Sequence, residues 1–272
     1  MKDFKNKVAV VTGGGGSGIG NHLVVELAKK GAKIAFCDIA DIEKTLADIK
    51  PYNTDVYSEK VDMGNKEAIK RFVQNVIHHF GGVNLLINNA GIALGDISFD
   101  KVSEQDFEKI TNINYWGVVY STQFFYPYLL KEKEAAIVNL SSSQGILALP
   151  YLVPYCTTKF AVRGFTDALR VENSVRGIKN VTVHTVHPGR VATDITLHAD
   201  YSGPRTNAFH NELQAGTSAQ KAAEIILKGV QKNKARIFIS DGKLQDLVAR
   251  LFPSHVDKIA KFVMKLKKLP TN

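Results

Sequence analysis

Residues 8–20 read Val8-Ala9-Val10-Val11-Thr12-Gly13-Gly14-Gly15-Gly16-Ser17-Gly18-Ile19-Gly20, a glycine-rich segment directly after a short apolar run. The run has the composition of a buried strand, and a helical pattern starts at Ile19. Glycines let the backbone approach a pyrophosphate closely, and a helix N-terminus favours the negative charge of that group. This strand–loop–helix order predicts a dinucleotide-binding site.

Apolar runs and helical patterns alternate along the rest of the chain. We expect strands at residues 8–11, 33–37, 56–61, 83–87, 136–140, 181–186 and 236–239, and helices at 19–30, 41–49, 66–79, 103–130 and 153–173. Continuous apolar strands separated by helices indicate a parallel sheet covered on both faces. No linker or repeat divides the sequence, so we predict that residues 1–272 form a single doubly wound α/β domain, the Rossmann fold.

The composition is that of a globular protein, since 44% of the 272 residues are hydrophobic and 22% are charged. No apolar stretch reaches the ~20 residues that cross a bilayer, and no signal peptide is recognised. The two cysteines form no framework, so we expect a cytoplasmic protein. We expect no metal site, because His184 and His187 would point to opposite faces of a strand. We expect no nucleic-acid partner, because much of the net charge of +9 comes from C-terminal lysines without aromatic neighbours.

Asp38 closes the second expected strand. A carboxylate at this position can accept hydrogen bonds from both ribose hydroxyls of adenosine. It would repel a 2′-phosphate, so we predict NAD as the cofactor and regard NADP as less favoured.

Tyr155 and Lys159 lie four residues apart, and Ser142 follows an apolar run upstream. On a helix the phenol and the ammonium would share one face. We expect the cation to lower the pKa of the tyrosine toward neutral pH, where it can exchange a proton. A serine hydroxyl nearby can hold a substrate oxygen.

These residues make the chain resemble the short-chain dehydrogenase/reductase family over residues 7–193. The segments Asn88-Asn89-Ala90-Gly91, Asn139-Leu140-Ser141-Ser142-Ser143 and Pro188-Gly189-Arg190-Val191-Ala192-Thr193 match its motifs. The resemblance implies a catalytic set of Asn114, Ser142, Tyr155 and Lys159. It implies cofactor contacts from Gly14, Ser17, Gly18, Ile19, Gly20, Asp38, Asp62, Met63, Asn89, Ala90, Gly91, Tyr155, Lys159, Pro188, Gly189, Val191 and Thr193.

The glycine-rich segment departs from the family spacing. Thr12 lies one residue further from Gly18-Ile19-Gly20 than the family pattern has it. The family's Gly-x-x-x-Gly-x-Gly spacing is present when it is counted from Gly14. Gly14 is therefore favoured over Gly13 as a cofactor contact, and we expect a bulge in this loop.

The resemblance implies hydride transfer between a nicotinamide cofactor and a secondary alcohol or ketone. Tyr155 would be the general acid/base, Lys159 would support it, Ser142 would hold the substrate oxygen, and Asn114 would hold a relay water. Two alternatives are an NADPH-linked 3-oxoacyl-carrier-type reductase, which Asp38 disfavours, and a non-catalytic dinucleotide-sensing protein, which would need no proton relay.

The substrate is expected to be a small hydrophobic alcohol or ketone. Residues 194–217 should close the pocket, and the apolar residues expected there are Ile146, Leu147, Leu149, Tyr151, Leu152, Ile195, Leu197, Tyr201 and Phe209. Arg190 and Arg205 are the cations that remain possible partners of a substrate carboxylate.

The C-terminal residues 254–269 have the pattern of a basic amphipathic helix. Such a helix can pack on its own domain, dock on another subunit of a homo-oligomer (dimer or tetramer), or make peripheral contact with an anionic membrane.

Overall fold

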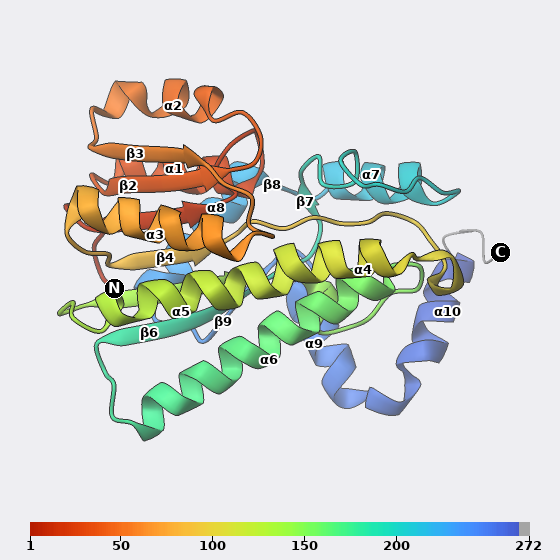
Figure 1. Cartoon of the computed structure of the whole chain (residues 1–272). Helices are drawn as coiled ribbons and strands as arrows, with labels where there is room; N and C mark the ends of the chain where they lie inside the picture. Colours follow the sequence, from red (N-terminus) through yellow and green to blue (C-terminus); the bar gives the residue numbers. More distant parts are fainter. Residues whose placement is uncertain (267–272) are drawn as a thin grey trace.

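The computed structural model describes residues 1–266 of the chain. Seven parallel strands form one sheet in the order β3-β2-β1-β4-β5-β6-β9 (Figure 1). They are β1 Val8–Thr12, β2 Lys33–Asp38, β3 Val56–Lys60, β4 Leu85–Asn88, β5 Ala135–Leu140, β6 Val181–Pro188 and β9 Arg236–Ile239. The predicted doubly wound α/β fold is confirmed.

The helices are α1 Ile19–Lys29, α2 Glu43–Ile49, α3 Lys66–Phe80, α4 Glu104–Thr111, α5 Gly117–Leu129, α6 Val153–Val175, α7 Thr206–Gln214, α8 Ala219–Gln231, α9 Gly242–Leu251 and α10 Val256–Leu266. Two short strands, β7 Val191–Ala192 and β8 Thr217–Ser218, pair outside the main sheet. Helix α10 lies within the tail segment 254–269, whose residues 267–269 lie outside the described chain.

Both faces of the sheet are buried, which explains why its strands are apolar at consecutive positions. Along β1, Ala9 and Val11 join one core cluster with α1 and α8, whereas Val10 joins a second cluster with α3 and α5. Successive side chains of a strand point to opposite faces, so both sets must be apolar when helices cover both sides.

The strand order places a topological switch between β1 and β4. The chain winds outward from β1 through β2 to β3, then returns to β4 on the other side of β1. In sheets of this kind ligands bind outside the carboxyl ends of the strands at the switch. The fold therefore points to the segments that follow Thr12 and Asn88 as the place of the site.

The expected uninterrupted helix at 103–130 is wrong in its middle. A π-helical turn, Asn112–Trp116, separates α4 from α5. Asn114 in this turn exchanges two hydrogen bonds with the backbone of Ile92, at 2.8 and 2.9 Å. A Cβ on Gly117 would lie 2.6 Å from the carbonyl oxygen of Met63. The wider turn brings Asn114 inward while α5 passes close to the Met63 backbone, and π turns of this kind occur often at functional sites.

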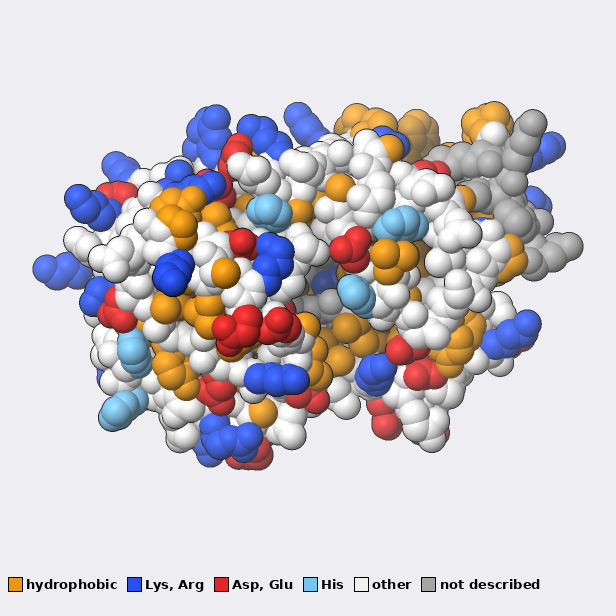
Figure 2. All heavy atoms as spheres, turned by 90° about the horizontal axis from the view of Figure 1, so that it is seen from above, with side chains coloured by type: hydrophobic (Ala, Val, Ile, Leu, Met, Phe, Trp, Pro, Cys, Tyr) orange, Lys and Arg blue, Asp and Glu red, His pale blue; other side chains and the backbone are white. Residues whose placement is uncertain are grey.

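Among the described residues, no helix combines the length and the apolar character needed to cross a membrane. Figure 2 shows Lys and Arg side chains spread around the outline of one face of the molecule.

Candidate active site

The glycine-rich loop is held tightly at both ends. Gly13 has a φ of +65°, and a Cβ there would lie 2.7 Å from the Ala90 Cα. A Cβ on Gly20 would lie 1.8 Å from the Gly13 carbonyl oxygen. Gly16 also has a φ of +65° but faces open space. The extra residue is thus absorbed within the loop, and packing requires glycine at Gly13 as well as at Gly14, where a Cβ would lie 2.9 Å from the Phe36 Cβ.

The segment after β4 is fastened to the end of β1. The Nδ2 atom of Asn89 donates to the carbonyl oxygens of Thr12 and Gly13, at 3.0 and 2.8 Å. In return, the Thr12 hydroxyl accepts from the backbone N–H groups of Asn89 and Ala90, both at 3.1 Å. Thr12 was missed as a site residue, although its place between the first strand and the glycines was a usable signal.

Helix α1 begins at this loop, and no side chain binds the free backbone N–H groups of its first turn. Its N-cap is Gly18, no side chain caps it, and its first turn contains no acidic residue. The orphan N–H groups and the positive end of the helix dipole are therefore directed at the loop. This arrangement fits an anionic group such as a pyrophosphate.

Asp38 lies beside the same loop at the end of β2. Its Oδ2 accepts from the Gly15 N–H at 2.8 Å, and its Oδ1 accepts from the Ala40 N–H at 2.9 Å. The next side chain, Ile39, is 59% exposed and supplies no positive charge. The strand end therefore presents a carboxylate without a neighbouring cation on the following residue.

The remaining predicted cofactor residues surround this edge of the sheet. Asp62 is exposed after β3, whereas Met63 is buried in a core cluster with residues of α3, and its carbonyl oxygen is covered by α5 at Gly117. Ser17 donates to Asp194 at 3.2 Å, which links the glycine loop to the segment after Thr193. Pro188 ends β6, Gly189 follows it, Val191 lies in β7, and Thr193 leads into this segment.

The four predicted catalytic residues come from three elements that meet at the switch. Ser142 follows β5, Tyr155 and Lys159 lie on α6, and Asn114 lies in the π turn. A Cβ on Gly91 would lie 3.2 Å from both the Asn114 Oδ1 and the Lys159 Nζ, so these two side chains converge on one glycine.

The hydrogen bonds of Lys159 and Ser142 fix both side chains. Lys159 is 5% exposed, and its ammonium donates to the Leu140 carbonyl at 3.1 Å. It lies 5.6 Å from the centre of the Tyr155 ring. The Ser142 hydroxyl donates to the Gln144 side chain at 2.8 Å.

The prediction that Lys159 lowers the pKa of Tyr155 is wrong for this structure. Burial raises the pKa of Tyr155 to about 12, and only the Ser142 hydroxyl opposes this shift. Burial also lowers the pKa of Lys159 to about 8. The physical reason is that both groups are desolvated and the ammonium is directed at Leu140. Lys159 therefore exchanges its proton close to neutral pH.

His187 contacts the backbone of the segment that carries Ser142. Its Nδ1 lies 3.1 Å from the Ser142 carbonyl oxygen, and its ring stacks on Phe238 at 5.3 Å. Burial lowers the pKa of His187 to about 4, so the ring is neutral at physiological pH. His184 instead contacts the Lys234 carbonyl at 2.7 Å. The two histidines have separate partners, and no sequence pattern predicted the contact between His187 and Ser142.

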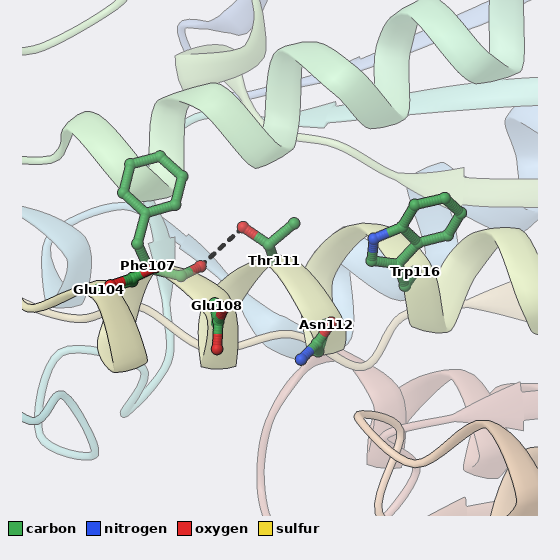
Figure 3. Close-up of a pocket in the computed structure, with 6 residues that line it drawn as sticks. All are labelled: Glu104, Phe107, Glu108, Thr111, Asn112 and Trp116. Atoms are coloured by element: carbon green, nitrogen blue, oxygen red, sulfur yellow. Dashed lines mark hydrogen bonds between the residues drawn. The ribbon is translucent and has the colours of Figure 1, made fainter.

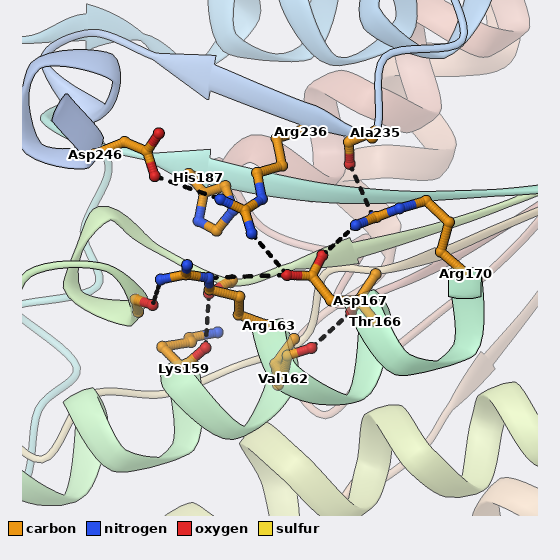
Figure 4. A network of polar contacts seen from close by, with 12 residues as sticks. Lys159, Val162, Arg163, Thr166, Asp167, Arg170, His187, Ala235, Arg236 and Asp246 are labelled. Atoms are coloured by element: carbon orange, nitrogen blue, oxygen red, sulfur yellow. Dashed lines mark hydrogen bonds and ion pairs between the residues drawn. The ribbon is translucent and has the colours of Figure 1, made fainter. Parts of the chain in front are cut away.

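An ion-pair network ties α6 to β9 and α9 behind the site (Figure 4). Arg236 binds Asp167 at 2.8 Å and Asp246 at 3.5 Å. Arg163 donates to the Gly145 carbonyl at 3.3 Å. These contacts fix the helix that carries Tyr155 and Lys159 against the end of the sheet.

A cavity of about 610 Å³ lies along α4 and the π turn (Figure 3). Its lining residues are Glu104, Phe107, Glu108, Thr111, Asn112 and Trp116. None of the four predicted catalytic residues lines it, so this cavity is separate from the candidate active site.

The segment 194–217, which contains α7, is bound to the loop after β4 by an ion pair and a backbone hydrogen bond. We call the ion pair between Arg205 and Asp96 the latch. Arg205 forms an ion pair with Asp96 at 2.7 Å, and its guanidinium lies 3.4 Å from the centre of the Tyr151 ring. Tyr201 donates its backbone N–H to the Leu94 carbonyl at 2.7 Å. Arg205 is 4% exposed, so it is engaged inside the fold rather than presented to a substrate carboxylate. The Arg190 side chain lies 3.7 Å from Asp241.

The chain matches known proteins over most of its length. The model of the family described as short chain dehydrogenase matches residues 7–201. The SadH protein of Mycobacterium tuberculosis, which carries an oxidoreductase name, is 37% identical over 266 residues that cover 95% of each chain. The protein named 11-beta-hydroxysteroid dehydrogenase-like 2 of Arabidopsis thaliana is 32% identical and covers 97% of this chain, with 83% of its own length matched.

Solved structures show the same fold. A short chain dehydrogenase/reductase from Burkholderia phymatum, in complex with NAD, has a TM-score of 0.85 at 24% identity and covers 94% of this chain and 96% of its own. An alcohol dehydrogenase from Thermococcus sibiricus, complexed with 5-hydroxy-NADP, has a TM-score of 0.71 at 22% identity, with 86% and 96% covered. On the family match and the identity to its relatives, this chain belongs to the short chain dehydrogenase family and is an oxidoreductase of that family.

Proposed function

We propose that the protein transfers hydride between NAD and a hydrophobic secondary alcohol or ketone. The observation that carries this proposal is the meeting of Ser142, Tyr155, Lys159 and Asn114 beside a glycine loop at the switch of the sheet. The residues present fit a dinucleotide, because the uncapped start of α1 suits its pyrophosphate and Asp38 suits its ribose. Bound there, the nicotinamide supplies or accepts the hydride.

The side chains divide the proton chemistry among them. In the oxidative direction the Tyr155 hydroxyl takes up the proton of the alcohol while it releases its own proton to the relay, so a resting phenolate is not required at a pKa of about 12. The Ser142 hydroxyl holds the same substrate oxygen. Lys159, whose pKa is lowered to about 8, stands within 5.6 Å of the Tyr155 ring and is the group that passes the proton on. Asn114 converges with Lys159 on Gly91 and orients the relay toward solvent.

NAD is favoured over NADP by charge. Asp38 presents a carboxylate at the strand end, and the exposed side chain that follows it is the apolar Ile39. A 2′-phosphate would meet a negative charge there without a cation from the next residue to balance it.

A coupled assay tests the proposed function. Purified protein is mixed with NAD or NADP and with hydrophobic secondary alcohols, matched hydroxy acids, or the corresponding ketones with the reduced cofactors, and the absorbance of the reduced nicotinamide is followed. We expect turnover with NAD and hydrophobic alcohols and little with hydroxy acids, because Arg205 is already engaged with Asp96. A clear preference for hydroxy acids, or absence of turnover with all substrates, would contradict the proposal.

We expect the latch at Arg205 to hold the segment 194–217 in place over the substrate pocket. Arg205→Lys keeps the charge but loses the planar group that lies over the Tyr151 ring and binds Asp96. We expect KM for a hydrophobic substrate to rise roughly fivefold, on the order of 1 kcal/mol for a weakened polar contact, with kcat little changed. Protease cleavage within residues 194–217 should become faster.

Arg190→Lys is the matched control for Arg205→Lys. Arg190 is about half exposed and lies 3.7 Å from its partner Asp241, so its exchange should leave KM and the cleavage rate unchanged. Equal effects of the two substitutions would argue against a latch at Arg205.

We propose further that the protein is a homo-oligomer whose subunits meet through α6 and the π turn before α5. Apolar side chains on these elements are exposed: Trp116 by 40%, Phe160 by 40%, Val171 by 61% and Val175 by 83%. Burial of such a patch stabilises association by roughly 25 cal/mol per Å² of apolar surface. We expect Val171→Glu with Val175→Glu to lower the molar mass measured by light scattering. An unchanged mass above that of a monomer would place the interface elsewhere.

A further inference from the structure

The chain ends in a helical hairpin with an uncovered apolar face. We call residues 242–266, which comprise α9, the turn Pro253–His255 and α10, the C-terminal hairpin. Its two helices form a V at the side of the molecule to which the strand arrows point (Figure 1). Along α9, Leu244, Leu247 and Leu251 are 62%, 53% and 62% exposed. Their spacing of three and four residues puts them on one face of the helix, which therefore forms an apolar stripe.

The second helix extends this surface. Phe262 and Leu266 on α10 are 62% and 66% exposed, whereas Met264 is the only residue of α10 that is buried. A cavity of about 540 Å³ lies along the turn after α9 and the adjoining face of α10, lined by Phe252, His255, Lys258, Ile259 and Phe262. Packing of α10 on its own domain therefore accounts for little of its apolar surface.

The charged residues of the hairpin indicate which kind of surface can cover its apolar face. Its basic residues are Lys243, Arg250, Lys258, Lys261 and Lys265, and its acidic residues are Asp246 and Asp257. Asp246 is already paired with Arg236 and Arg250. Figure 2 shows hydrophobic and basic side chains next to each other at the upper right edge, beside the end of the described chain. A broad apolar face bordered by cations complements an anionic lipid surface, whose headgroups attract lysines while its acyl region takes up Leu and Phe.

The hairpin is joined to the candidate site. Asp241, directly before α9, accepts a hydrogen bond from the Arg190 N–H at 3.2 Å. A Cβ on Gly189 would lie 3.1 Å from the Gly242 nitrogen. The start of α9 thus packs on the loop that follows β6, at the carboxyl edge of the sheet beside the candidate site.

From these observations we propose that the C-terminal hairpin binds the surface of an anionic membrane and turns the substrate entrance toward the lipid. Resting on the proposed function, this assigns the substrate class more narrowly: an alcohol or ketone apolar enough to be dissolved in the bilayer. The proposal explains why exposed leucines and phenylalanines stand beside lysines at this edge.

The test measures vesicle binding separately from turnover. Full-length protein is sedimented with phosphatidylcholine vesicles that do or do not contain phosphatidylserine, at low and high salt. We expect binding to the anionic vesicles at low salt and release by salt. Lys258→Glu with Lys261→Glu should weaken this binding at least about tenfold, because each cation near an anionic surface contributes measurably. The matched control, Lys228→Glu with Lys232→Glu at the C-terminal end of α8, should bind like the wild type.

A second variant tests the apolar face. Leu247→Ser, Leu251→Ser and Phe262→Ser change exposed residues, so folding should be retained. We expect loss of vesicle binding, unchanged turnover of a water-soluble alcohol, and loss of any stimulation by vesicles with a long-chain alcohol. Turnover without vesicle binding would overturn the membrane proposal alone, and vesicle binding without turnover would overturn only the proposed function. A drop in molar mass with unchanged vesicle binding would show that the hairpin is a subunit interface, which also overturns the proposal.

Discussion

Tyr155→Phe is expected to lower turnover at least ~10²-fold, the lower scale of general acid–base catalysis. The substitution removes the hydroxyl that exchanges a proton with the substrate oxygen and keeps the aromatic ring. Lys159 cannot replace it, because its ammonium is held by the Leu140 carbonyl at 3.1 Å. NAD binding, measured by calorimetry or fluorescence, should be retained, so the loss should appear in kcat.

Tyr57→Phe is the control for this experiment. Burial raises the pKa of Tyr57 to about 12, as it does for Tyr155, but Tyr57 lies in β3 and packs on Phe72. We expect its exchange to leave kcat unchanged, which would show that a raised pKa alone does not mark the catalytic tyrosine. Near-normal turnover of Tyr155→Phe would remove this residue from the mechanism.

Asp38→Ala is expected to narrow the preference for NAD over NADP by about 1–3 kcal/mol, the scale of hydrogen bonds to a charged group. The carboxylate would lose its bonds to the ribose, and its repulsion of a 2′-phosphate would disappear together with them. The measurement is the ratio of kcat/KM with the two cofactors. Because Asp38 also accepts from Gly15 at 2.8 Å, the glycine loop should loosen and efficiency with NAD should fall.

Asp55→Asn separates the local effect from a change in net charge. Asp55 precedes β3, at the end of the sheet where the parallel strands begin, and lies 3.0 Å from His79. Its exchange should leave the cofactor ratio unchanged. Equal efficiency of the wild-type protein with NAD and NADP would refute the role of Asp38.

Local sequence was enough to predict the sheet, whereas the full set of site residues came from the resemblance to a known family. The apolar run before the glycines predicted β1, and the spacing of Tyr155 and Lys159 predicted that both lie on one helix. These inferences succeeded because strand and helix periodicity and the order of parallel strands depend on neighbouring residues and on simple packing.

Other features depend on contacts between distant segments. Gly13 must be glycine because Ala90 approaches it, a contact that appears only once β1 and β4 are paired. The direction of the Lys159 ammonium is set by the Leu140 carbonyl, which the i and i+4 spacing with Tyr155 does not reveal. The latch between Asp96 and Arg205 joins positions 109 residues apart. The π turn likewise depends on contacts of Asn114 with Ile92 and of Gly117 with Met63, which are distant in the sequence.

That π turn has a consequence for how the chain tolerates insertions and deletions. A π turn holds one residue more than an α-helical turn, so α5 continues the direction of α4 although the chain is one residue longer. If the same residues formed a regular α-helix, with 3.6 residues per turn, every side chain of α5 would be rotated by about 100° around the helix axis. Phe125 and Leu129, both fully buried, would then swing out of the core. Deleting one residue from Asn112–Trp116 should therefore leave the packing of α5 in place and disturb the contact of Asn114 with Ile92, whereas a deletion within α5 itself would rotate its buried face.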